Sequence, residues 1–395
     1  LRRALEGAGH LFRTNSDTEV IVHAYEEWGA ACVERFRGMF AFGIVDLNAR
    51  QLFLARDHLG IKPLYYLQLP DRLAFASELQ ALRHVPARLE LDLEAVDQYL
   101  WLQYIPAPRS IYRQIRKLPP AHHLTVSFDG QLSGPTRFWQ LQYQPDYTRS
   151  EGEWLEALDA VLRDAVRTHL VSDVPFGAFL SGGVDSSTIV AYMAELLDAP
   201  VRTFSIGFDE AEFNELPYAE EVARRCGTEH HVELVKPDAL EVLPKLVEHY
   251  GEPFGDSSAI PTYYLCRMAR QSLPMVLSGD GGDELFDGYG TYRGWMAAHR
   301  QEMQPQWKRL LRPLARLVFP RRFPPRRTPD LAGWISLISY IDTPQRRQLW
   351  RPDYQRGCPA PLEVFEREYA RTEGYGLCER VQNLDIHTYL PYDIL

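Results

Sequence analysis

The chain has 395 residues, of which 45% are hydrophobic and 24% charged, and its formal net charge is −10. This length suffices for two or three domains with ordinary cores, and the composition is typical of a soluble globular protein. The acidic balance argues against a nucleic-acid or anionic-membrane partner, and no apolar run is long enough to span a bilayer.

Cysteine usage points to a reducing compartment. The five cysteines lie far apart, without a CxxC pair or a histidine at zinc-finger spacing. We therefore expect reduced thiols in a cytoplasmic protein. These residues are Cys32, Cys226, Cys266, Cys358 and Cys378.

The two ends of the chain are abrupt. It begins at Leu1 rather than Met, in a stretch patterned like folded protein, and runs to Leu395 without a change in composition. No signal peptide opens it. We therefore expect a segment of a longer protein, cut at both ends.

Residues 1–145 have the pattern of a mostly antiparallel sheet domain with a few helices. Aromatic and aliphatic runs of strand length are separated by turn residues such as Asp46-Leu-Asn48. Asp129-Gly130 adds a hairpin signal after the last run. The predicted strands are 39–45, 51–55, 63–67, 73–76 and 124–128.

The pattern changes after residues 146–152, where we place the domain boundary. Apolar residues from Trp154 to Val166 recur at helical spacing and predict an amphipathic helix, after which strands alternate with helices. Such alternation predicts βα units and a parallel sheet. The predicted strands are 176–180, 201–206, 231–235 and 274–277, and the helices are 189–197, 218–226 and 240–250.

A basic stretch at 305–329 carries eight lysine or arginine side chains and six prolines. A nucleic-acid or phosphate patch is one interpretation. Because no glycine-rich or aromatic-stacking motif accompanies the charges, a solvated helix and loop is favoured.

The strongest chemical signal is the loop Ser181-Gly182-Gly183-Val184-Asp185-Ser186-Ser187, between a predicted strand and a predicted helix. Ligands of parallel sheets bind at the carboxyl ends of the strands. The glycines let backbone amides approach a polyanion, and the helix N-terminus and the serine hydroxyls add donors. A carboxylate among phosphates requires a cation, so Asp185 implies Mg²⁺.

This loop differs from the GxxxxGK phosphate loop, because no lysine reaches toward the β- and γ-phosphates. Holding those two phosphates as a unit suits cleavage between the α- and β-phosphates, with pyrophosphate leaving. The alternative is a serine- and glycine-rich helix cap without a ligand, which the length and order of the motif disfavour.

An acidic turn at 278–284 also follows a predicted strand. Its carboxylates, Asp280, Asp283 and Glu284, repel one another unless a metal or a cationic substrate lies among them. An EF-hand calcium loop is excluded because glycine occupies the third position counted from Asp280. A plain glycine-rich turn remains the alternative.

Two weaker signals accompany these loops. Residues 250–261 place Glu252 and Asp256 at a helix junction, suited to an amine-bearing substrate or only to capping. The adjacent His230 and His231 would face opposite sides of a strand, so we expect structural roles for them.

Together these motifs resemble a known family. The 181–187 loop resembles the pyrophosphate loop of the ATP-pyrophosphatase superfamily, and with 227–231, 252–258 and 278–284 it is similar to the asparagine synthetase family. The first half of the chain resembles that family's N-terminal-nucleophile glutaminase domain. The stretches that carry this second likeness are 13–21, 38–42, 56–66 and 75–78.

The resemblance implies both a fold and a set of ligands. The fold would be α/β: a partial N-terminal-nucleophile glutaminase sandwich of α+β type in 1–148, followed by a parallel-sheet ATP-pyrophosphatase domain in 149–395. ATP and Mg²⁺ would be the cofactors. Aspartate, glutamine and ATP would be the small-molecule partners, with no nucleic acid or membrane, and a homodimer is left open.

Individual roles follow where residues match the family. The resemblance assigns Asp17 to the glutamine amino group, Asp185 and Asp283 to Mg²⁺, and Asp280 to formation of a β-aspartyl-AMP intermediate. A carboxylate at Asp280 could orient the substrate and accept a proton from attacking ammonia. The expected ATP-binding positions are Leu180, Ser181, Gly182, Gly183, Asp185, Ser186, Ser187, Ile206, Ser278 and Gly279.

Two family features are missing from this sequence. One is the N-terminal cysteine nucleophile with the upstream glutamine contacts, and the other is a Lys-x-Asp-Arg stretch expected shortly after Leu395. We therefore expect the isolated chain to be inactive.

The parent protein would be a ligase that amidates aspartate with ammonia from glutamine and releases AMP and pyrophosphate. A related amidotransferase, or a β-lactam or peptide-cyclising synthetase with another acid acceptor, is one alternative. The glutaminase motifs disfavour the cyclising enzymes. A non-catalytic ATP-binding remnant is the other alternative.

Overall fold

The computed structural model describes residues 1–209, 214–302, 329–354 and 362–395. Its chain forms two compact units. Unit 1 contains Leu1–Gln142, Tyr250–Phe254 and Gly290–Leu395, and unit 2 contains Tyr143–His249 and Gly255–Tyr289. The predicted basic stretch at 305–329 lies outside the described residues, apart from its last position.

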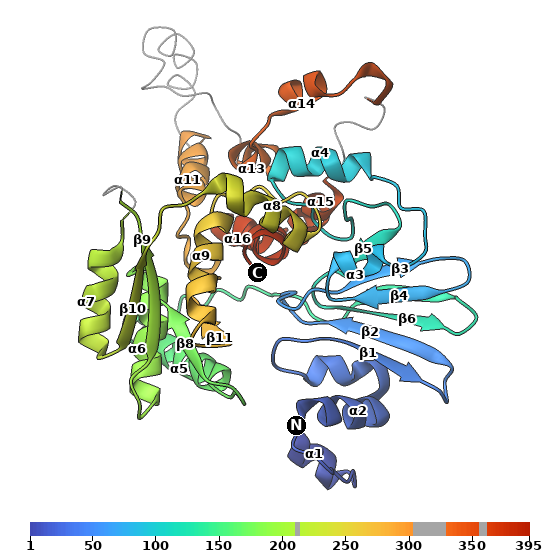
Figure 1. The fold of residues 1–395 in the computed structure, drawn as a ribbon, viewed down its shortest axis with the longest axis horizontal. Helices are drawn as coiled ribbons and strands as arrows, with labels where there is room; N and C mark the ends of the chain where they lie inside the picture. Colours follow the sequence, from blue (N-terminus) through green and yellow to red (C-terminus); the bar gives the residue numbers. More distant parts are fainter. Residues whose placement is uncertain (210–213, 303–328, 355–361) are drawn as a thin grey trace. The chain divides into compact units, whose positions relative to one another are not determined.

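Unit 1 contains two antiparallel sheets (Figure 1). The first has the order β1-β2-β6-β7, and the second has the order β4-β3-β5. The turn predicted at Asp129-Gly130 joins β6 to β7 as a hairpin, so the expected antiparallel domain is confirmed. The strands are β1 (Ala41–Asp46), β2 (Gln51–Arg56), β3 (Tyr65–Gln68), β4 (Leu73–Ala76), β5 (Ile115–Lys117), β6 (His122–Ser127) and β7 (Leu132–Arg137).

Strand alternation builds unit 1 into layers. Phe53 and Ala55 of β2 pack with residues of the N-terminal helices, whereas Leu54 packs with Tyr66 of the second sheet. Leu67, on the opposite side of β3, packs with the next two helices. The result is a sandwich of helices, two sheets and helices. Its helices are α1 (Arg2–Gly7), α2 (Asp17–Trp28), the 3₁₀ helix η1 (Gly29–Arg35), α3 (Leu79–Arg83) and α4 (Leu93–Leu102).

A group of later helices completes unit 1. Trp295 and Trp334 are fully buried and meet edge to face, with ring centroids 5.8 Å apart. Tyr292 beside them donates a hydrogen bond to Asp385 at 2.8 Å. The elements are α11 (Gly290–Glu302), α13 (Leu331–Ile338), α14 (Thr343–Leu349), η3 (Pro352–Tyr354), α15 (Glu363–Ala370), α16 (Leu377–Thr388) and η4 (Leu390–Ile394).

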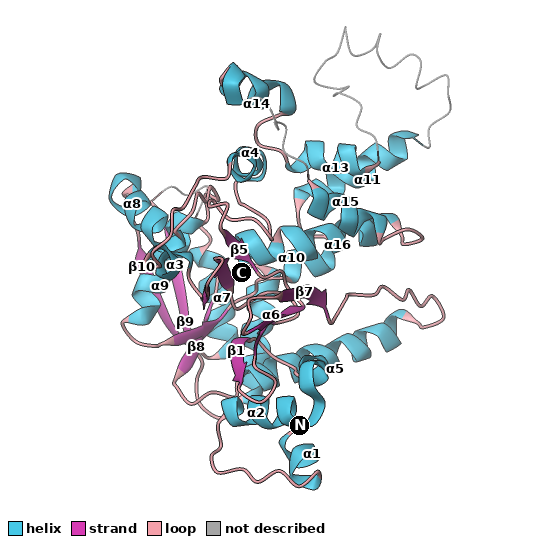
Figure 2. Ribbon diagram, turned by 90° about the vertical axis from the view of Figure 1, so that its right-hand side faces the viewer, coloured by secondary structure: helices cyan, strands magenta, loops and turns pink. Residues whose placement is uncertain are grey.

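Unit 2 has one parallel sheet with the order β10-β9-β8-β11, which confirms the predicted βα alternation (Figure 2). The strands are short, and helices pack on both faces of the sheet. They are β8 (Phe176–Phe179), β9 (Arg202–Gly207), β10 (Glu229–Leu234) and β11 (Met275–Leu277). The helices are α5 (Glu151–His169), α6 (Val184–Leu196), α7 (Leu216–Cys226), α8 (Ala239–Tyr250), α9 (Ala259–Arg270) and α10 (Gly282–Phe286).

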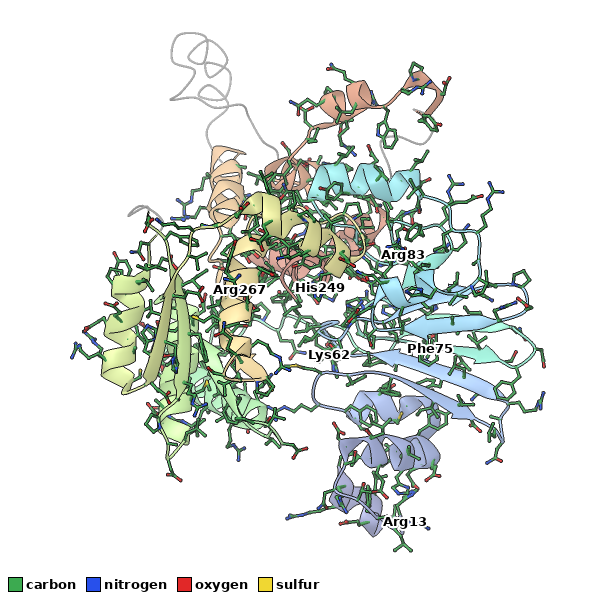
Figure 3. The ribbon with its side chains drawn as sticks, viewed as in Figure 1. Arg13, Lys62, Phe75, Arg83, His249 and Arg267 are labelled. Atoms are coloured by element: carbon green, nitrogen blue, oxygen red, sulfur yellow. The ribbon has the colours of Figure 1, made fainter. Side chains whose placement is uncertain are left out.

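The two faces of this sheet have separate cores. Ala178 and Leu180 pack with residues of α5, α6 and α7, whereas Phe204 packs with Met268 of α9. Arg267, also on α9, lies 4.7 Å from the centre of the Tyr264 ring (Figure 3). These contacts hold the carboxyl ends of the strands between two rigid helical layers.

The predicted helix at 154–166 forms as α5, with a capping box at Ser150 and Glu153. Its apolar positions are less buried than the amphipathic pattern predicts. Val166 packs in the core, but Leu155 and Val161 are 60% and 65% exposed. In the described residues, no helix combines the length and apolarity needed to cross a membrane.

Candidate functional site

Unit 2 has a topological switch point between two adjacent parallel strands. From β8 the chain passes through α6 to β9 on one side, while β11 lies on the other side of β8. Ligands in open parallel sheets bind where the connections diverge in this way, at the carboxyl ends of the strands. The loop 181–187 follows β8 and the turn 278–284 follows β11, so both predicted motifs lie at the switch point.

The 181–187 loop forms a compact nest of hydroxyl and amide groups. The hydroxyls of Ser181 and Ser186 lie 3.0 Å apart, and the Gly183 amide donates to the Ser181 hydroxyl at 3.2 Å. Helix α6 begins at Val184 without a side-chain cap. The Ser187 hydroxyl is buried and has no hydrogen-bond partner in the described residues. Uncapped amides and a free hydroxyl at a helix N-terminus suit an oxyanion ligand.

Glycine is required in both motifs because the backbones approach closely. Gly182 has a φ of +85°, and a Cβ atom there would lie 2.5 Å from the Ala219 amide nitrogen of α7. In the acidic turn, a Cβ at Gly282 would lie 2.4 Å from Cγ of Asp185. A Cβ at Gly279 would lie 2.7 Å from the backbone nitrogen of Ser186. The acidic turn therefore packs directly on the first loop.

This packing brings together carboxylates that the sequence separates by about a hundred positions. Burial, and then the charge of Asp185, raises the pKa of Asp283. Burial also raises the pKa of Glu284, which accepts a hydrogen bond from Tyr289 at 2.8 Å. Asp280 is exposed and accepts a hydrogen bond from Ser278 at 2.6 Å. No lysine or arginine pairs with these acids in the described ranges.

A cavity of about 420 Å³ opens between the two motifs. Its volume lies in the range of small-molecule sites. Of the predicted site residues, those that line it are Leu180, Ser181, Gly183, Asp185, Ser186, Ile206, Ser278, Gly279, Asp280 and Asp283. Gly182 and Ser187 lie in the same loop but do not line the cavity.

Several lining residues were missed by sequence reasoning. Phe179 ends β8, Phe204 lies within β9, Glu215 precedes α7, and Thr262 and Leu265 belong to α9. The strand-end positions follow from the parallel sheet itself. Helix α9 carries no motif, and only the fold shows that one of its faces borders the cavity.

The weaker predicted signals have structural partners. Glu252, in unit 1, is buried, pairs with Lys117 and accepts a hydrogen bond from the Ile111 amide at 3.1 Å. His230 bonds to the Thr203 hydroxyl at 2.9 Å, and His231 stacks on Phe204. These contacts support structural roles for all three side chains.

Two residues of unit 1 bear on the expected glutamine chemistry. Asp17 is exposed at the first position of α2, with its side chain 3.5 Å from the Ser16 hydroxyl. Cys32 is fully buried in η1, where burial raises the pKa of its thiol to about 11. A thiol that stays protonated and has no solvent access is a poor nucleophile. In the described part of the chain, Cys226, Cys266 and Cys378 also form no disulfide bond.

Comparison with known proteins gives two family matches. Residues 157–395 match asparagine synthase, and residues 1–139 match a glutamine amidotransferase domain. Asparagine synthetase (glutamine-hydrolyzing) 1 of Bacillus subtilis is 34% identical over 403 residues, covering 100% of this chain and 63% of that protein. An asparagine synthetase homologue from Methanocaldococcus jannaschii is 41% identical, covering 71% of this chain and 55% of its own length.

Among solved structures, the glutamine phosphoribosylpyrophosphate amidotransferase of Bacillus subtilis matches 64% of this chain and 66% of its own, with 14% identity and a TM-score of 0.27. The chain thus spans about three fifths of the length of the curated relatives that it matches, 63% and 55% in the two cases above.

Proposed function

The chain belongs to the asparagine synthase family, and from this premise we propose that its parent protein forms asparagine from aspartate, ATP and ammonia derived from glutamine. The reaction proceeds through β-aspartyl-AMP and releases AMP and pyrophosphate. The observation that carries the proposal is the cavity at the switch point, bounded by an oxyanion-binding loop on one side and unneutralised carboxylates on the other.

The proposed division of labour follows the two predicted domains. Residues 1–148 belong to the glutamine-hydrolysing part, in which Asp17 holds the substrate's amino group. Residues 149–395 belong to the ATP-dependent part. This division concerns function and differs from the division into compact units, because residues 290–395 belong to the same unit as residues 1–142.

In the ATP-dependent part, the 181–187 loop binds the leaving pyrophosphate through backbone amides and hydroxyls. The Ser181 and Ser186 hydroxyls line the cavity, and the Ser187 hydroxyl of the same loop has no hydrogen-bond partner in the described residues. The backbones of Leu180 and Ile206 flank the adenine nucleotide, and Leu180 is itself fixed by a bond from its amide to Phe204 at 3.0 Å. Ser278 and Gly279 complete the nucleotide site from the opposite loop.

The residues present fit a Mg²⁺ ion, because two carboxylates lie close together and no lysine or arginine in the described ranges pairs with either. The charge of Asp185 contributes to the raised pKa of Asp283, and this repulsion disappears when a divalent cation binds between them. Asp185 and Asp283 are therefore the proposed ligands. When bound, the ion neutralises phosphate charge and helps to orient the phosphates.

Asp280 has a different proposed role, since it is exposed and its bond partner is Ser278 rather than another acid. From the wall of the cavity it orients the amino group or acyl carbon of the bound aspartate. It then accepts a proton as ammonia attacks the β-aspartyl-AMP. Water has to be kept from this intermediate, and the apolar lining by Phe179, Phe204 and Leu265 serves that purpose.

The test separates these two acids. Asp283→Asn weakens MgATP binding about 100-fold in calorimetry, equivalent to about 2.7 kcal/mol. Asp280→Asn leaves MgATP binding unchanged but slows pyrophosphate release by the full-length protein when aspartate and ammonia are supplied directly. Glu195→Gln, at the far end of α6 from the loop, is the control and changes neither measurement.

Equal loss of nucleotide affinity in Asp280→Asn and Asp283→Asn would make the turn a single metal-binding unit and end the separate role of Asp280. Normal MgATP affinity in both variants would remove the metal assignment. Pyrophosphate release with another acid, and none with aspartate, would replace the proposed acceptor.

A further inference from the structure

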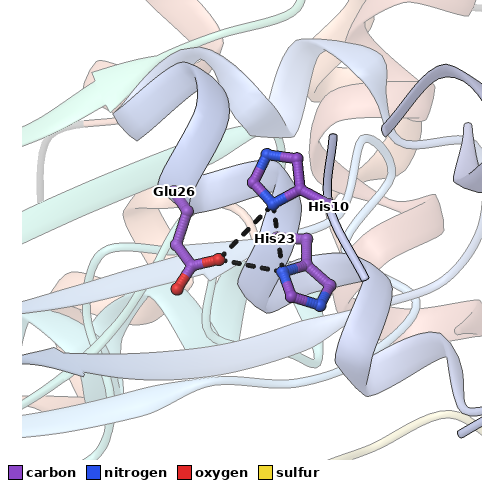
Figure 4. Close-up of side chains that lie close together, drawn as sticks. All are labelled: His10, His23 and Glu26. Atoms are coloured by element: carbon purple, nitrogen blue, oxygen red, sulfur yellow. Dashed lines mark hydrogen bonds and ion pairs between the residues drawn. The ribbon is translucent and has the colours of Figure 1, made fainter. Parts of the chain in front are cut away.

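A second group of potential ligands lies in unit 1, far along the sequence from the carboxylates of the nucleotide cavity. His10 belongs to the segment between α1 and α2, while His23 and Glu26 lie three positions apart on one face of α2 (Figure 4). In the described residues these are the only three acidic, histidine or cysteine side chains whose ligand atoms lie within 4.8 Å of one another.

The three ligand atoms form a nearly equilateral triangle. Nδ1 of His10 lies 3.2 Å from Nδ1 of His23, which lies 2.9 Å from Oε2 of Glu26. The third side, from His10 to Glu26, is 3.6 Å. A tetrahedral zinc ion with bonds of about 2.0–2.1 Å has ligand atoms about 3.3 Å apart. The triangle therefore has the size of one face of a zinc tetrahedron.

The opposite nitrogens of both rings face carboxylates. Nε2 of His10 lies 3.1 Å from Glu27, and Nε2 of His23 lies 3.7 Å from Glu19. A carboxylate holds the ring proton on the nitrogen that it faces, which leaves the lone pair on the other nitrogen. Both Nδ1 lone pairs and the Glu26 oxygen are then available to a single cation.

The surroundings fix this arrangement before any ion arrives. Glu19 accepts hydrogen bonds from the amides of Arg13 and Thr14, both at 2.7 Å, so it holds the segment that carries His10 as well as facing His23. The Phe12 ring meets His23 edge to face with centroids 4.7 Å apart. Preorganised ligands bind a metal without the cost of ordering flexible side chains.

Exposure leaves one side of the triangle open. The side chains of His10 and His23 are only 16% and 17% exposed, whereas Glu26 is 56% exposed. Three protein ligands with an open fourth position are typical of zinc sites that also hold water. Three carboxylates, Glu19, Glu26 and Glu27, supply negative charge around the two imidazole rings.

We propose that His10, His23 and Glu26 bind a zinc-class divalent cation, with Glu27 and Glu19 orienting the two imidazoles. The ion joins the segment after α1 to the middle of α2 and fixes the N-terminal helical layer of the sandwich. Imidazole with carboxylate suits Zn²⁺ and its neighbours better than Mg²⁺, so this site is chemically distinct from the proposed magnesium ligands.

The experiment is titration of the chain with Zn²⁺ against a chromogenic chelator, followed by Co²⁺ substitution and absorption spectroscopy. Wild type binds one Zn²⁺ at this site, and the Co²⁺ spectrum shows nitrogen and oxygen ligands without a thiolate band. His23→Ala weakens binding by about 100-fold or more. Glu27→Gln, which removes only an orienting carboxylate, weakens it about tenfold.

The matched control is His231→Ala, since His231 also faces a glutamate, Glu229 at 3.1 Å, but in the described residues it belongs to no group of three potential metal ligands. This variant keeps wild-type affinity. Zn²⁺ also raises the melting temperature of wild type but not of His23→Ala, whose folding is checked by circular dichroism.

Absence of Zn²⁺ binding by wild type would overturn the proposal. Undiminished binding by a His10→Ala, His23→Ala double variant, or a thiolate band with Co²⁺, would place the metal on the cysteines instead. If His23→Ala is misfolded, Glu26→Gln is measured in its place, and unchanged affinity there also overturns the proposal.

Discussion

Buried and half-buried acids are treated in opposite ways in the two units. In unit 1 three strongly buried carboxylates have a cationic partner: Asp97 with Arg346, Glu252 with Lys117, and Glu368 with Arg137. In unit 2, Asp283 faces another acid, Asp185, and no arginine or lysine pairs with either in the described residues. The first set is neutralised within the protein, and we propose that the second set is neutralised by a ligand.

The presence or absence of a cationic partner distinguishes structural from functional carboxylates better than their burial does. A buried ion pair costs desolvation but becomes costly to break, because the surviving partner is left unneutralised. An acid with no protein cation destabilises the empty protein and is retained for what it binds. Loss of a carboxylate should therefore destabilise unit 1 and stabilise the ligand-free unit 2.

The largest expected effect is in unit 1. Asp97→Ala leaves Arg346, whose side chain is 1% exposed, without its ion-pair partner and removes the acceptor of the Trp350 indole at 2.9 Å. The free energy of unfolding falls by about 3–5 kcal/mol. Urea unfolding followed by tryptophan fluorescence measures it.

The control for this prediction is an exposed ion pair. Glu195→Ala removes the partner of Arg163, and both side chains are more than a third exposed. Its cost is at most about 1 kcal/mol. Equal effects of Asp97→Ala and Glu195→Ala would contradict the structural role given to the buried pair.

The next effect is the pH dependence conferred by Glu368. Burial opposes ionisation of this acid, but hydrogen bonding by Arg137 and further positive charges outweigh burial and lower its pKa from 4.5 to about 2. Its stabilisation is therefore present above pH 4.5 and is lost as the pH falls toward 2. The shift corresponds to about 3 kcal/mol.

Urea unfolding of wild type and Glu368→Gln over this acid range checks the prediction. Wild type loses stability as the pH falls, and the difference between the two proteins shrinks with it. A difference that stays constant from neutral to acid pH would mean that Glu368 contributes through packing rather than charge.

The smallest effect has the opposite sign. Asp283→Asn removes the repulsion from Asp185 and raises the stability of the ligand-free chain by about 0.5 kcal/mol. Because the pKa of Asp283 is raised, the stability of wild type falls by this amount as the pH rises above 3.8, whereas the stability of the variant does not. Thermal unfolding at two pH values without Mg²⁺ or nucleotide measures it. A destabilised variant would show that Asp283 is structural.

Much of the fold follows from local pattern. The runs at 51–55 and 73–76 become β2 and β4 because alternation and turn residues act within a few positions. The two loops of the cavity were recognisable for the same reason, since strand, glycine turn and helix are contiguous in each. Their contact through Gly282 and Asp185 could be expected only from a parallel sheet, not from the sequence of either loop.

The remaining features depend on partners that are remote in sequence. The sequence leaves Glu252 as a substrate ligand or a cap, and its lysine partner lies in β5, far earlier in the chain. An irregular segment separates His10 from His23, so no periodic pattern in the sequence predicts their contact. The exposure of Leu155 on α5 likewise depends on what packs against a helix, which its own spacing does not encode.

The interrupted sequence of unit 1 affects the order in which the molecule can assemble during synthesis. Arg346 closes on Asp97 across 249 positions, and Arg137 meets Glu368 across 231. The strands of the sandwich are therefore synthesised long before the helices that pack with them, and Asp97 has no Arg346 to pair with until those helices are made. Unit 2 is nearly continuous and can be complete by residue 289. Unit 2 can therefore fold first, and the sandwich reaches its final stability only afterwards.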